Sequence, residues 1–136
     1  METPSSALKR ILVVDDEPLV ANAVKMVLTF AGYKVQTAGS GEEALATMEQ
    51  GEFDLIITDF SMQGMKGDEL ALHIKARWPH LPVIMLTAYA ENIRDSLNVV
   101  TCVDTLISKP FDVDQLRLAV ARALAGGNSQ APPEPS

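Results

Sequence analysis

The chain has 136 residues, a length that suits one domain with a single hydrophobic core and leaves too little for two independently stable domains. Hydrophobic residues make up 47% of the sequence, which predicts a globular chain, and no apolar run is long enough to span a membrane. The net charge of -7 argues against binding to nucleic acid or to a membrane surface. The sequence lacks a secretory signal and has a single cysteine, Cys102, which predicts a cytoplasmic protein without an internal disulfide.

Short β-branched runs alternate with longer stretches of helical spacing, a pattern typical of βα units stacked around a parallel sheet. We expect five strands, at Arg10–Val14, Lys34–Ala38, Asp54–Thr58, Pro82–Leu86 and Thr105–Ser108. The expected helices are Pro18–Ala31, the segment from Ser40 to Gly51, Gly67–Ala76, Glu91–Val99 and Val113–Leu124. Continuous apolar runs in the first, third and fourth strands predict burial on both faces of the sheet, whereas Lys34–Ala38 alternates and is expected at an edge. The Glu91–Val99 segment has little periodicity, so we expect that helix to be short or mobile.

The composition changes at Gly126, beyond which glycine, proline and small polar residues dominate. Such a segment cannot bury enough apolar surface to offset the entropy that ordering costs. We therefore expect a folded domain over residues 9–125 and a flexible Pro-rich tail or linker over residues 126–136.

Polar side chains follow four of the predicted strands. They are Asp15-Asp16-Glu17 after the first strand, Asp59 after the third, Thr87 after the fourth and Ser108-Lys109-Pro110 at the fifth. Ligands of open parallel sheets bind outside the carboxyl ends of the strands, where the loops of neighbouring units converge. We therefore expect these side chains to face one small volume.

Three carboxylates in one place repel each other unless a cation neutralises them, and Mg²⁺ suits carboxylate, water and substrate oxygens. No His or Cys pair at ligand spacing indicates zinc. With Lys109 and the Thr87 hydroxyl opposite, such a site can hold a phosphoryl group, and an Asp carboxylate can act as the nucleophile. Each residue alone also has a plainer interpretation, because Asp is common in strand-to-helix loops and an isolated lysine is usually solvated. Pro110 could be an ordinary loop proline or follow a cis peptide bond.

The sequence resembles the receiver domain of bacterial two-component response regulators over about residues 9 to 124. The segments that carry the resemblance are Ile11-Leu12-Val13-Val14-Asp15-Asp16-Glu17, Asp54-Leu55-Ile56-Ile57-Thr58-Asp59, Met62-Gln63-Gly64-Met65-Lys66-Gly67, Leu86-Thr87-Ala88 and Lys109-Pro110-Phe111. The resemblance implies a doubly wound (βα)5 flavodoxin-like α/β sandwich whose five parallel strands lie in the order 2-1-3-4-5.

The resemblance also implies a function in a phosphorelay. The domain would accept a phosphoryl group on Asp59 from a phosphohistidine of a sensor histidine kinase or histidine phosphotransfer protein, with Mg²⁺ as cofactor, and would not act as an enzyme. The implied ligands of Mg²⁺ are Asp15, Asp16, Asp59 and the main-chain carbonyl of Ser61. The implied phosphoryl contacts are Thr87, Ala88 and Lys109. The conformational change would then control a partner or an output domain, either fused or separate.

Three positions concern the loops and the conformational switch. Gln63 stands where the family usually has a proline, which restores an amide hydrogen and frees the backbone of the loop after Asp59. Leu106 replaces the usual aromatic residue three positions before Lys109, so we expect the switch to work through backbone and packing shifts. Tyr89 could cover the phosphorylation pocket and slow the access of water, or be a half-exposed loop aromatic.

Three other functions are compatible with parts of the sequence. The segment Gly39-Ser40-Gly41-Glu42-Glu43-Ala44 fits a loose dinucleotide fingerprint, but two glutamates would repel a pyrophosphate at that helix end. A phosphohydrolase with an aspartyl phosphate intermediate usually has a second carboxylate two residues after the nucleophile, where this chain has Ser61. An interaction module that is not phosphorylated would have no need of the full set of five reactive side chains.

Overall fold

The computed structural model describes residues 8–88 and 97–126. Ten helices and strands in these ranges alternate along the chain: β1 (Arg10–Val14), α2 (Pro18–Phe30), β2 (Lys34–Ala38), α3 (Gly41–Gln50), β3 (Leu55–Asp59), α4 (Gly67–Arg77), β4 (Val83–Thr87), α6 (Leu97–Cys102), β5 (Thr105–Ser108) and α7 (Val113–Gly126). All strand pairs are parallel and the order is β2-β1-β3-β4-β5, which confirms the expected fold. No helix in these ranges is both long enough and apolar enough to cross a membrane.

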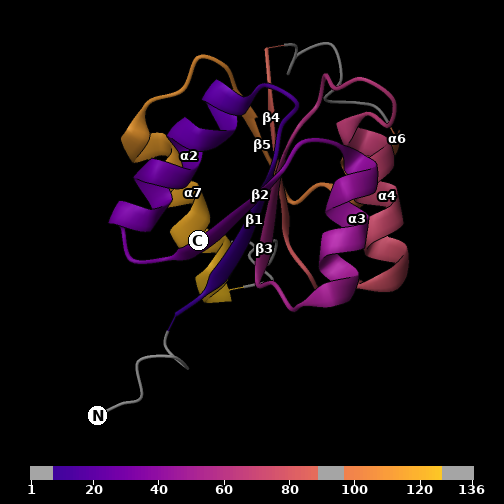
Figure 1. Cartoon of the computed structure of the whole chain (residues 1–136), viewed down its shortest axis with the longest axis horizontal. Helices are drawn as coiled ribbons and strands as arrows, with labels where there is room; N and C mark the ends of the chain where they lie inside the picture. The colour runs from indigo at the N-terminus through magenta and orange to yellow at the C-terminus, as the bar shows by residue number, and fades with distance from the viewer. Residues whose placement is uncertain (1–7, 89–96, 127–136) are drawn as a thin grey trace, which may run out of the picture.

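The sheet lies between two layers of helices, with α2 and α7 on one face and α3, α4 and α6 on the other (Figure 1). Alternation along β1 divides the core accordingly: Ile11 and Val13 pack into the cluster on the α2 and α7 side, and Leu12 and Val14 into the cluster on the opposite side. Every residue of β3 and β4 is buried, as expected for central strands, whereas β2 at the edge alternates between exposed and partly buried residues until the buried Ala38.

Helix α3 begins with a reciprocal cap. The Glu43 main-chain N–H donates to Ser40 Oγ at 3.0 Å, and the Glu43 carboxylate accepts from the Gly39 main-chain N–H at 2.9 Å. At this end of the helix, which a dinucleotide would need for its pyrophosphate, the Gly39 and Glu43 N–H groups are therefore already bonded to the chain's own side chains. At the end of α2, Gly32 has φ 107°, a left-handed conformation that favours glycine and agrees with the predicted helix stop.

Several predicted boundaries were wrong by one or two residues. Strand β3 is Leu55–Asp59 instead of Asp54–Thr58, because the Asp54 carboxylate accepts the Arg10 main-chain N–H at 2.8 Å and Asp54 thus lies before the strand. Strand β4 likewise begins at Val83, after Pro82, and ends at Thr87. Helix α2 ends one residue earlier than expected, α4 one residue later and α7 two residues later. The predicted helix Glu91–Val99 falls mostly outside the described residues, which show α6 at Leu97–Cys102.

Helix α2 has apolar side chains on both of its faces. Ala21, Val24 and Leu28 are buried against the sheet. On the opposite face, Leu19, Met26 and Phe30 are 85%, 72% and 93% exposed. With these spacings of seven and four residues, the three side chains share one side of the helix. We call Leu19, Met26 and Phe30 the α2 stripe.

Candidate functional site

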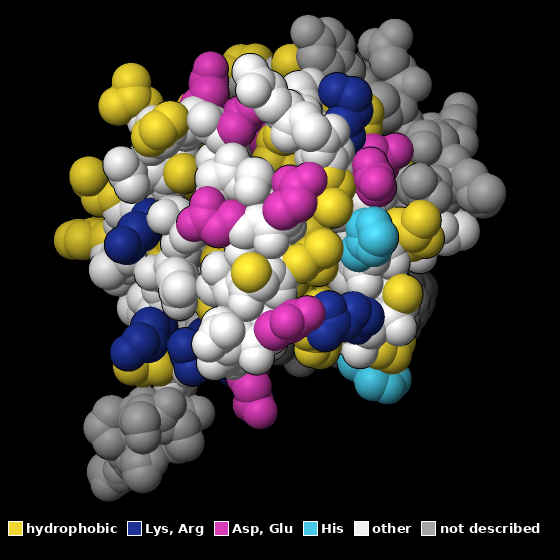
Figure 2. All heavy atoms as spheres, turned by 45° about the vertical axis from the view of Figure 1, so that its right-hand side comes forward, with side chains coloured by type: hydrophobic (Ala, Val, Ile, Leu, Met, Phe, Trp, Pro, Cys, Tyr) yellow, Lys and Arg dark blue, Asp and Glu magenta, His cyan; other side chains and the backbone are white. Residues whose placement is uncertain are grey.

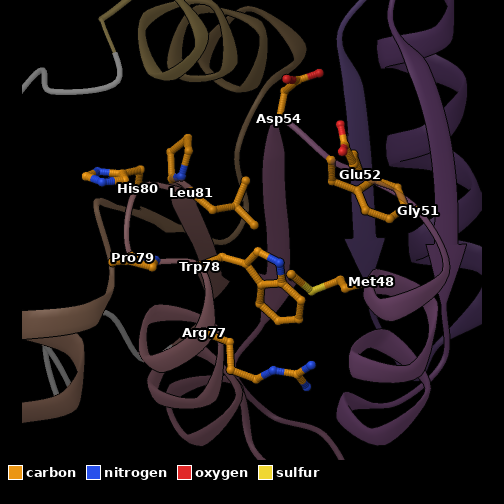
Figure 3. A pocket seen from close by; sticks show the side chains of 11 residues that line it. Met48, Gly51, Glu52, Asp54, Arg77, Trp78, Pro79, His80 and Leu81 are labelled. Carbon is orange, nitrogen blue, oxygen red and sulfur yellow. The ribbon is translucent and has the colours of Figure 1, made fainter.

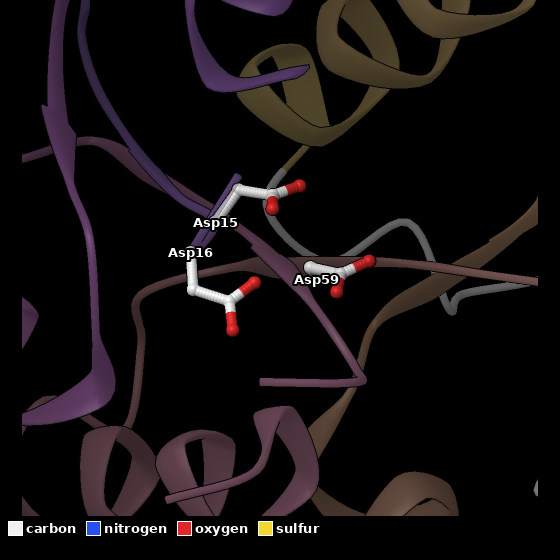
Figure 4. Close-up of side chains that lie close together, drawn as sticks. All are labelled: Asp15, Asp16 and Asp59. Atoms are coloured by element: carbon white, nitrogen blue, oxygen red, sulfur yellow. The ribbon is translucent and has the colours of Figure 1, made fainter. Parts of the chain in front are cut away.

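The carboxyl ends of the strands bring the predicted acidic residues together. Asp15 and Asp16 directly follow β1, and Asp59 is the last residue of its neighbour β3. One carboxylate oxygen from each of the three lies within 4.8 Å of the others (Figure 4). The register places them there: Val14, the last residue of β1, pairs with Thr58, so Asp15 and Asp59 are the next residues along the two neighbouring strands.

Lys109 reaches this cluster from the loop after β5. Its Nζ donates to Asp59 Oδ1 at 2.6 Å and lies 4.0 Å from Asp15 Oδ2. Both Asp59 and Asp15 are almost fully buried, at 6% and 5% exposed. An ion pair in such surroundings is screened far less than one on the surface. Lys109 therefore supplies fixed positive charge directly at the Asp59 carboxylate.

Asp15 carries the least satisfied carboxylate of the three. Its Oδ1 accepts the Glu17 main-chain N–H at 2.9 Å, but its Oδ2 is buried and lacks a hydrogen-bond partner among the described residues. Burial raises the pKa of the Asp15 carboxyl, the hydrogen bond from Glu17 lowers it, and the negative charge of Asp59 raises it again. Weaker effects of Lys109, which lowers the pKa, and of Asp16, which raises it, leave the balance above the ordinary value.

Asp16 is held by a different part of the chain. Its Oδ2 accepts the main-chain N–H of Gln63, in the loop between β3 and α4, at 3.1 Å. Each of the three carboxylates thus has one donor at hydrogen-bond distance: Glu17 N–H for Asp15, Gln63 N–H for Asp16 and Lys109 Nζ for Asp59.

A cavity of about 200 Å³ opens beside the cluster. Its lining consists of Asp15, Asp16, Glu17, Asp59, Ser61, Ala88 and Lys109. Six of these were predicted from the sequence, and the seventh, Glu17, was not assigned to the site although it stands in the same acidic triplet. The exposed Glu17 adds a third negative side chain at the mouth of the cavity on the β1 side.

The remaining predicted residues are placed as follows. Thr87 is 2% exposed and ends β4, where its main-chain carbonyl accepts the Lys109 N–H at 2.8 Å, but it does not line the cavity. The Lys109–Pro110 peptide bond is cis. Leu106 lies in β5 and lines a separate cavity between β5 and α7. Tyr89 lies outside the described residues.

The donor set fits a hard divalent cation. Three carboxylates and the nearby Ser61 backbone offer oxygen ligands, which Mg²⁺ prefers, and the described residues that line the cavity include no sulfur or imidazole group. Asp15 Oδ2 is the strongest sign, because this buried oxygen accepts no hydrogen bond from the described residues and the Lys109 ammonium comes only within 4.0 Å of it, so a cation in direct contact would stabilise it further. The described residues at this edge can therefore hold Mg²⁺.

The cluster predicts a penalty in stability when no cation is bound. Because the folded-state pKa of Asp15 is raised, the folded chain binds more protons than the unfolded chain between the two pKa values, and its stability falls as pH rises through that acidic window. With a chelator present at pH 7, Asp15→Asn should therefore unfold at a higher urea concentration than the native chain. Its free energy of unfolding should be larger by about 1 kcal/mol. The difference should shrink as the pH is lowered towards the ordinary pKa of an Asp carboxyl. A native chain that is the more stable of the two at pH 7 would contradict this expectation.

A larger cavity, of about 530 Å³, lies at the other end of the strands, near the residues that precede β3 and β4 (Figure 3). Its walls include Trp78, Met48 and Leu81, with the guanidinium of Arg77 4.6 Å from the centroid of the Trp78 ring. Arg77 also pairs with Glu49 at 2.7 Å. Figure 2 shows a face of the molecule on which acidic and basic side chains lie interspersed. The smaller cavity, not this one, combines buried carboxylates with a lysine, and we assign the chemistry there.

Comparisons with known proteins agree with this geometry. Residues 11–121 match the family model described as the response regulator receiver domain. The probable transcriptional regulatory protein TcrX of Mycobacterium tuberculosis is 34% identical over 115 residues, which are 84% of this chain and 48% of that protein. The regulatory protein AtoC of Escherichia coli is 32% identical over 88% of this chain and 26% of its own length. The chain thus spans about half or a quarter of these relatives.

Two solved structures of similar length share the fold. The response regulator protein TrrA of Thermotoga maritima, solved in complex with Mg(2+)-BeF, is 39% identical with a TM-score of 0.79, over 84% of this chain and 97% of that one. A CheY-like receiver domain protein of Methanospirillum hungatei is 31% identical with a TM-score of 0.84, over 92% of this chain and 100% of that one. The chain therefore belongs to the response regulator receiver domain family, which acts in two-component signal transduction.

Proposed function

We propose that this domain accepts one phosphoryl group on Asp59, in a reaction that depends on Mg²⁺, and thereby changes conformation. The observation that carries the proposal is the contact of 2.6 Å between Lys109 Nζ and Asp59 Oδ1 inside a cluster of three carboxylates. A buried nucleophile, a fixed cation and oxygen ligands for a metal are the groups that phosphoryl transfer to a carboxylate requires.

Mg²⁺, held by Asp15, Asp16, Asp59 and the main-chain carbonyl of Ser61, would offset the negative charge of the approaching phosphoryl group. An oxygen of Asp59 forms the bond to phosphorus while the bond from phosphorus to the donor breaks. Lys109 can then pair with a phosphoryl oxygen, because its ammonium already lies beside the accepting carboxylate. We assign the Thr87 hydroxyl and the small Ala88 to the same phosphoryl group, Thr87 as a contact and Ala88 as the residue that leaves room.

The proposed donor is a phosphohistidine on a sensor histidine kinase or a histidine phosphotransfer protein. Support comes from the family and from the α2 stripe, which is exposed on the helix that starts directly after Asp16 and Glu17. Apolar side chains exposed in a row favour a protein partner over a small solute. Ser61 has no carboxylate for acid–base catalysis, so we propose acceptance of the group and no turnover of small phosphate esters.

The proposed output is a change in binding to a partner or an output domain. Support comes from the relatives TcrX and AtoC, which are regulatory proteins about two to four times as long as the matched region. The negative charge added at Asp59 would shift an existing equilibrium between two conformations, and Thr87 at the end of β4 and Leu106 in β5 are the residues we expect to respond.

Incubation with acetyl phosphate tests the central step. With Mg²⁺ present, the intact mass should increase by one phosphoryl group, and removal of Mg²⁺ with a chelator should slow this gain at least about 100-fold because several kcal/mol of charge stabilisation are lost. Readdition of excess Mg²⁺ should restore the rate, which controls for damage by the chelator. A native chain that gains no phosphoryl mass from acetyl phosphate or from a phosphohistidine donor would refute the proposal.

A further inference from the structure

The loop between β3 and α4, residues 60–66, contacts the acidic cluster through its backbone. The main-chain N–H of Gln63 donates to Asp16 Oδ2 at 3.1 Å, a contact between residues 47 positions apart in the sequence. Gln63 itself is exposed and Asp16 is half-buried. The donor belongs to the main chain, so any residue except proline could provide it at this position.

Packed residues on both sides of Gln63 fix the place of this N–H. Met62 is 4% exposed and packs into the core cluster on the α3 and α4 side. On the other side of Gln63, Gly64 has φ 76°, a left-handed conformation that turns the chain, and Met65 packs against Gly41 so closely that a Cβ there would lie 2.8 Å from its sulfur. The Gln63 N–H thus lies between anchored residues, and its direction toward Asp16 does not depend on a mobile side chain.

The contact also determines how Asp16 presents its carboxylate. One oxygen of Asp16 points toward Asp59 and the other points away (Figure 4). With Oδ2 engaged by Gln63, rotation of the carboxylate would break a hydrogen bond from a fixed donor. Carboxylates that ligate metals are commonly held by such hydrogen bonds, and loss of the donor typically weakens metal binding about 10- to 100-fold.

We propose that the Gln63 main-chain N–H is a positioning group of the cation site: it holds Asp16 in the orientation that Mg²⁺ needs before the ion arrives. This inference rests on the proposed function, in which the three carboxylates bind Mg²⁺. It also couples the 60–66 loop to the site, because displacement of the loop would release Asp16 and lower the affinity for the ion.

The test compares Gln63→Pro, which removes the N–H, with the matched control Gln63→Ala, which keeps it. Mg²⁺ is titrated into the full chain while the amide signals of residues around the cluster are followed by NMR. We expect the Kd of Gln63→Pro for Mg²⁺ to rise about 10-fold and that of Gln63→Ala to stay within about twofold of the native value. Equal affinities of the proline variant and the native chain overturn the proposal.

A double-variant cycle separates this effect from a general change of the loop. In the Asp16→Ala background, Gln63→Pro should not weaken Mg²⁺ binding further, since the group through which the N–H acts is gone. A loss of the same size in that background overturns the positioning role. If the native chain does not bind Mg²⁺ at all, the metal site of the proposed function is itself wrong. The titration of the native chain therefore tests the proposed function separately from the role of Gln63.

A measurement without metal covers the case in which Gln63→Pro does not fold. In the native chain with a chelator present, the Gln63 amide hydrogen should be protected from exchange, and Asp16→Ala should speed its exchange at least about 10-fold because a charge-assisted hydrogen bond is lost. The Glu17 amide, which donates to Asp15, should keep its protection and serves as the internal control. Unchanged exchange at Gln63 overturns the proposal whether or not the chain is phosphorylated.

Discussion

Asp59→Asn should abolish the gain of a phosphoryl group from acetyl phosphate, taking the modified fraction from nearly complete to below detection by intact mass. The amide has nearly the shape of the carboxylate and its oxygen can still accept from Lys109, so the fold should persist. What the variant lacks is the anionic oxygen that forms the bond to phosphorus. The expected effect is therefore a loss of chemistry without a loss of structure.

Asp54→Asn is the matched control for this variant. It makes the same change of charge next to the same strand, but at the opposite edge of the sheet, where Asp54 accepts the Arg10 main-chain N–H. Its phosphorylation should equal that of the native chain. If Asp59→Asn still gained one phosphoryl group, and peptide mapping placed it on another residue, the assignment of Asp59 would be wrong.

Gly67→Ala should destabilise the domain by about 3 kcal/mol, a loss at the upper end of what overpacking causes. A Cβ at Gly67 would overlap the main-chain oxygen of Asp59 and lie 2.9 Å from the Cα of Phe60. Both atoms belong to the backbone at the acceptor, which cannot yield as a flexible side chain can. Alanine otherwise favours a helix, so the sign of the effect should reveal the clash. Urea unfolding measures the loss.

Gly51→Ala controls for the removal of a glycine. Its nearest neighbour would be Arg10 Nη2 at 3.6 Å, an ordinary contact, and its φ of -158° is extended backbone that any residue adopts. This variant should stay within about 0.5 kcal/mol of the native chain. We also expect Gly67→Ala to slow phosphorylation, because the main chain at Asp59 must shift to admit the methyl group. Native stability in Gly67→Ala would contradict the close packing seen here.

The fold could be predicted because its signals are local. The apolar runs of β1, β3 and β4 are short, rich in valine and isoleucine and each followed by a polar residue, and the alternation of Lys34–Ala38 placed β2 at an edge. The strand ends were harder, because hydrogen bonds and not hydrophobicity decide them. Asp54 is adjacent to an apolar run, yet its side chain binds the Arg10 backbone and leaves Asp54 outside β3.

The members of the site could be predicted in part. Four of its residues lie at or directly after the carboxyl end of a strand: Asp15, Asp16, Asp59 and Lys109. Parallel strands bring these ends together on the same side of the sheet. The contact between Gln63 and Asp16 had no local signal, because it joins two loops through a backbone group that every residue but proline has. The exposure of Leu19, Met26 and Phe30 was equally hidden, since their spacing is compatible with a helix that turns either face to the core.

The α2 stripe has a thermodynamic consequence. Its three large side chains order a layer of water in the free domain, and that water raises the heat capacity of the solution. A protein that covers the stripe releases this water, so its binding should become more exothermic as the temperature rises. Acetyl phosphate needs no such cover. The temperature dependence of the binding enthalpy should therefore separate partners that dock on α2 from small molecules that enter the acidic cavity alone.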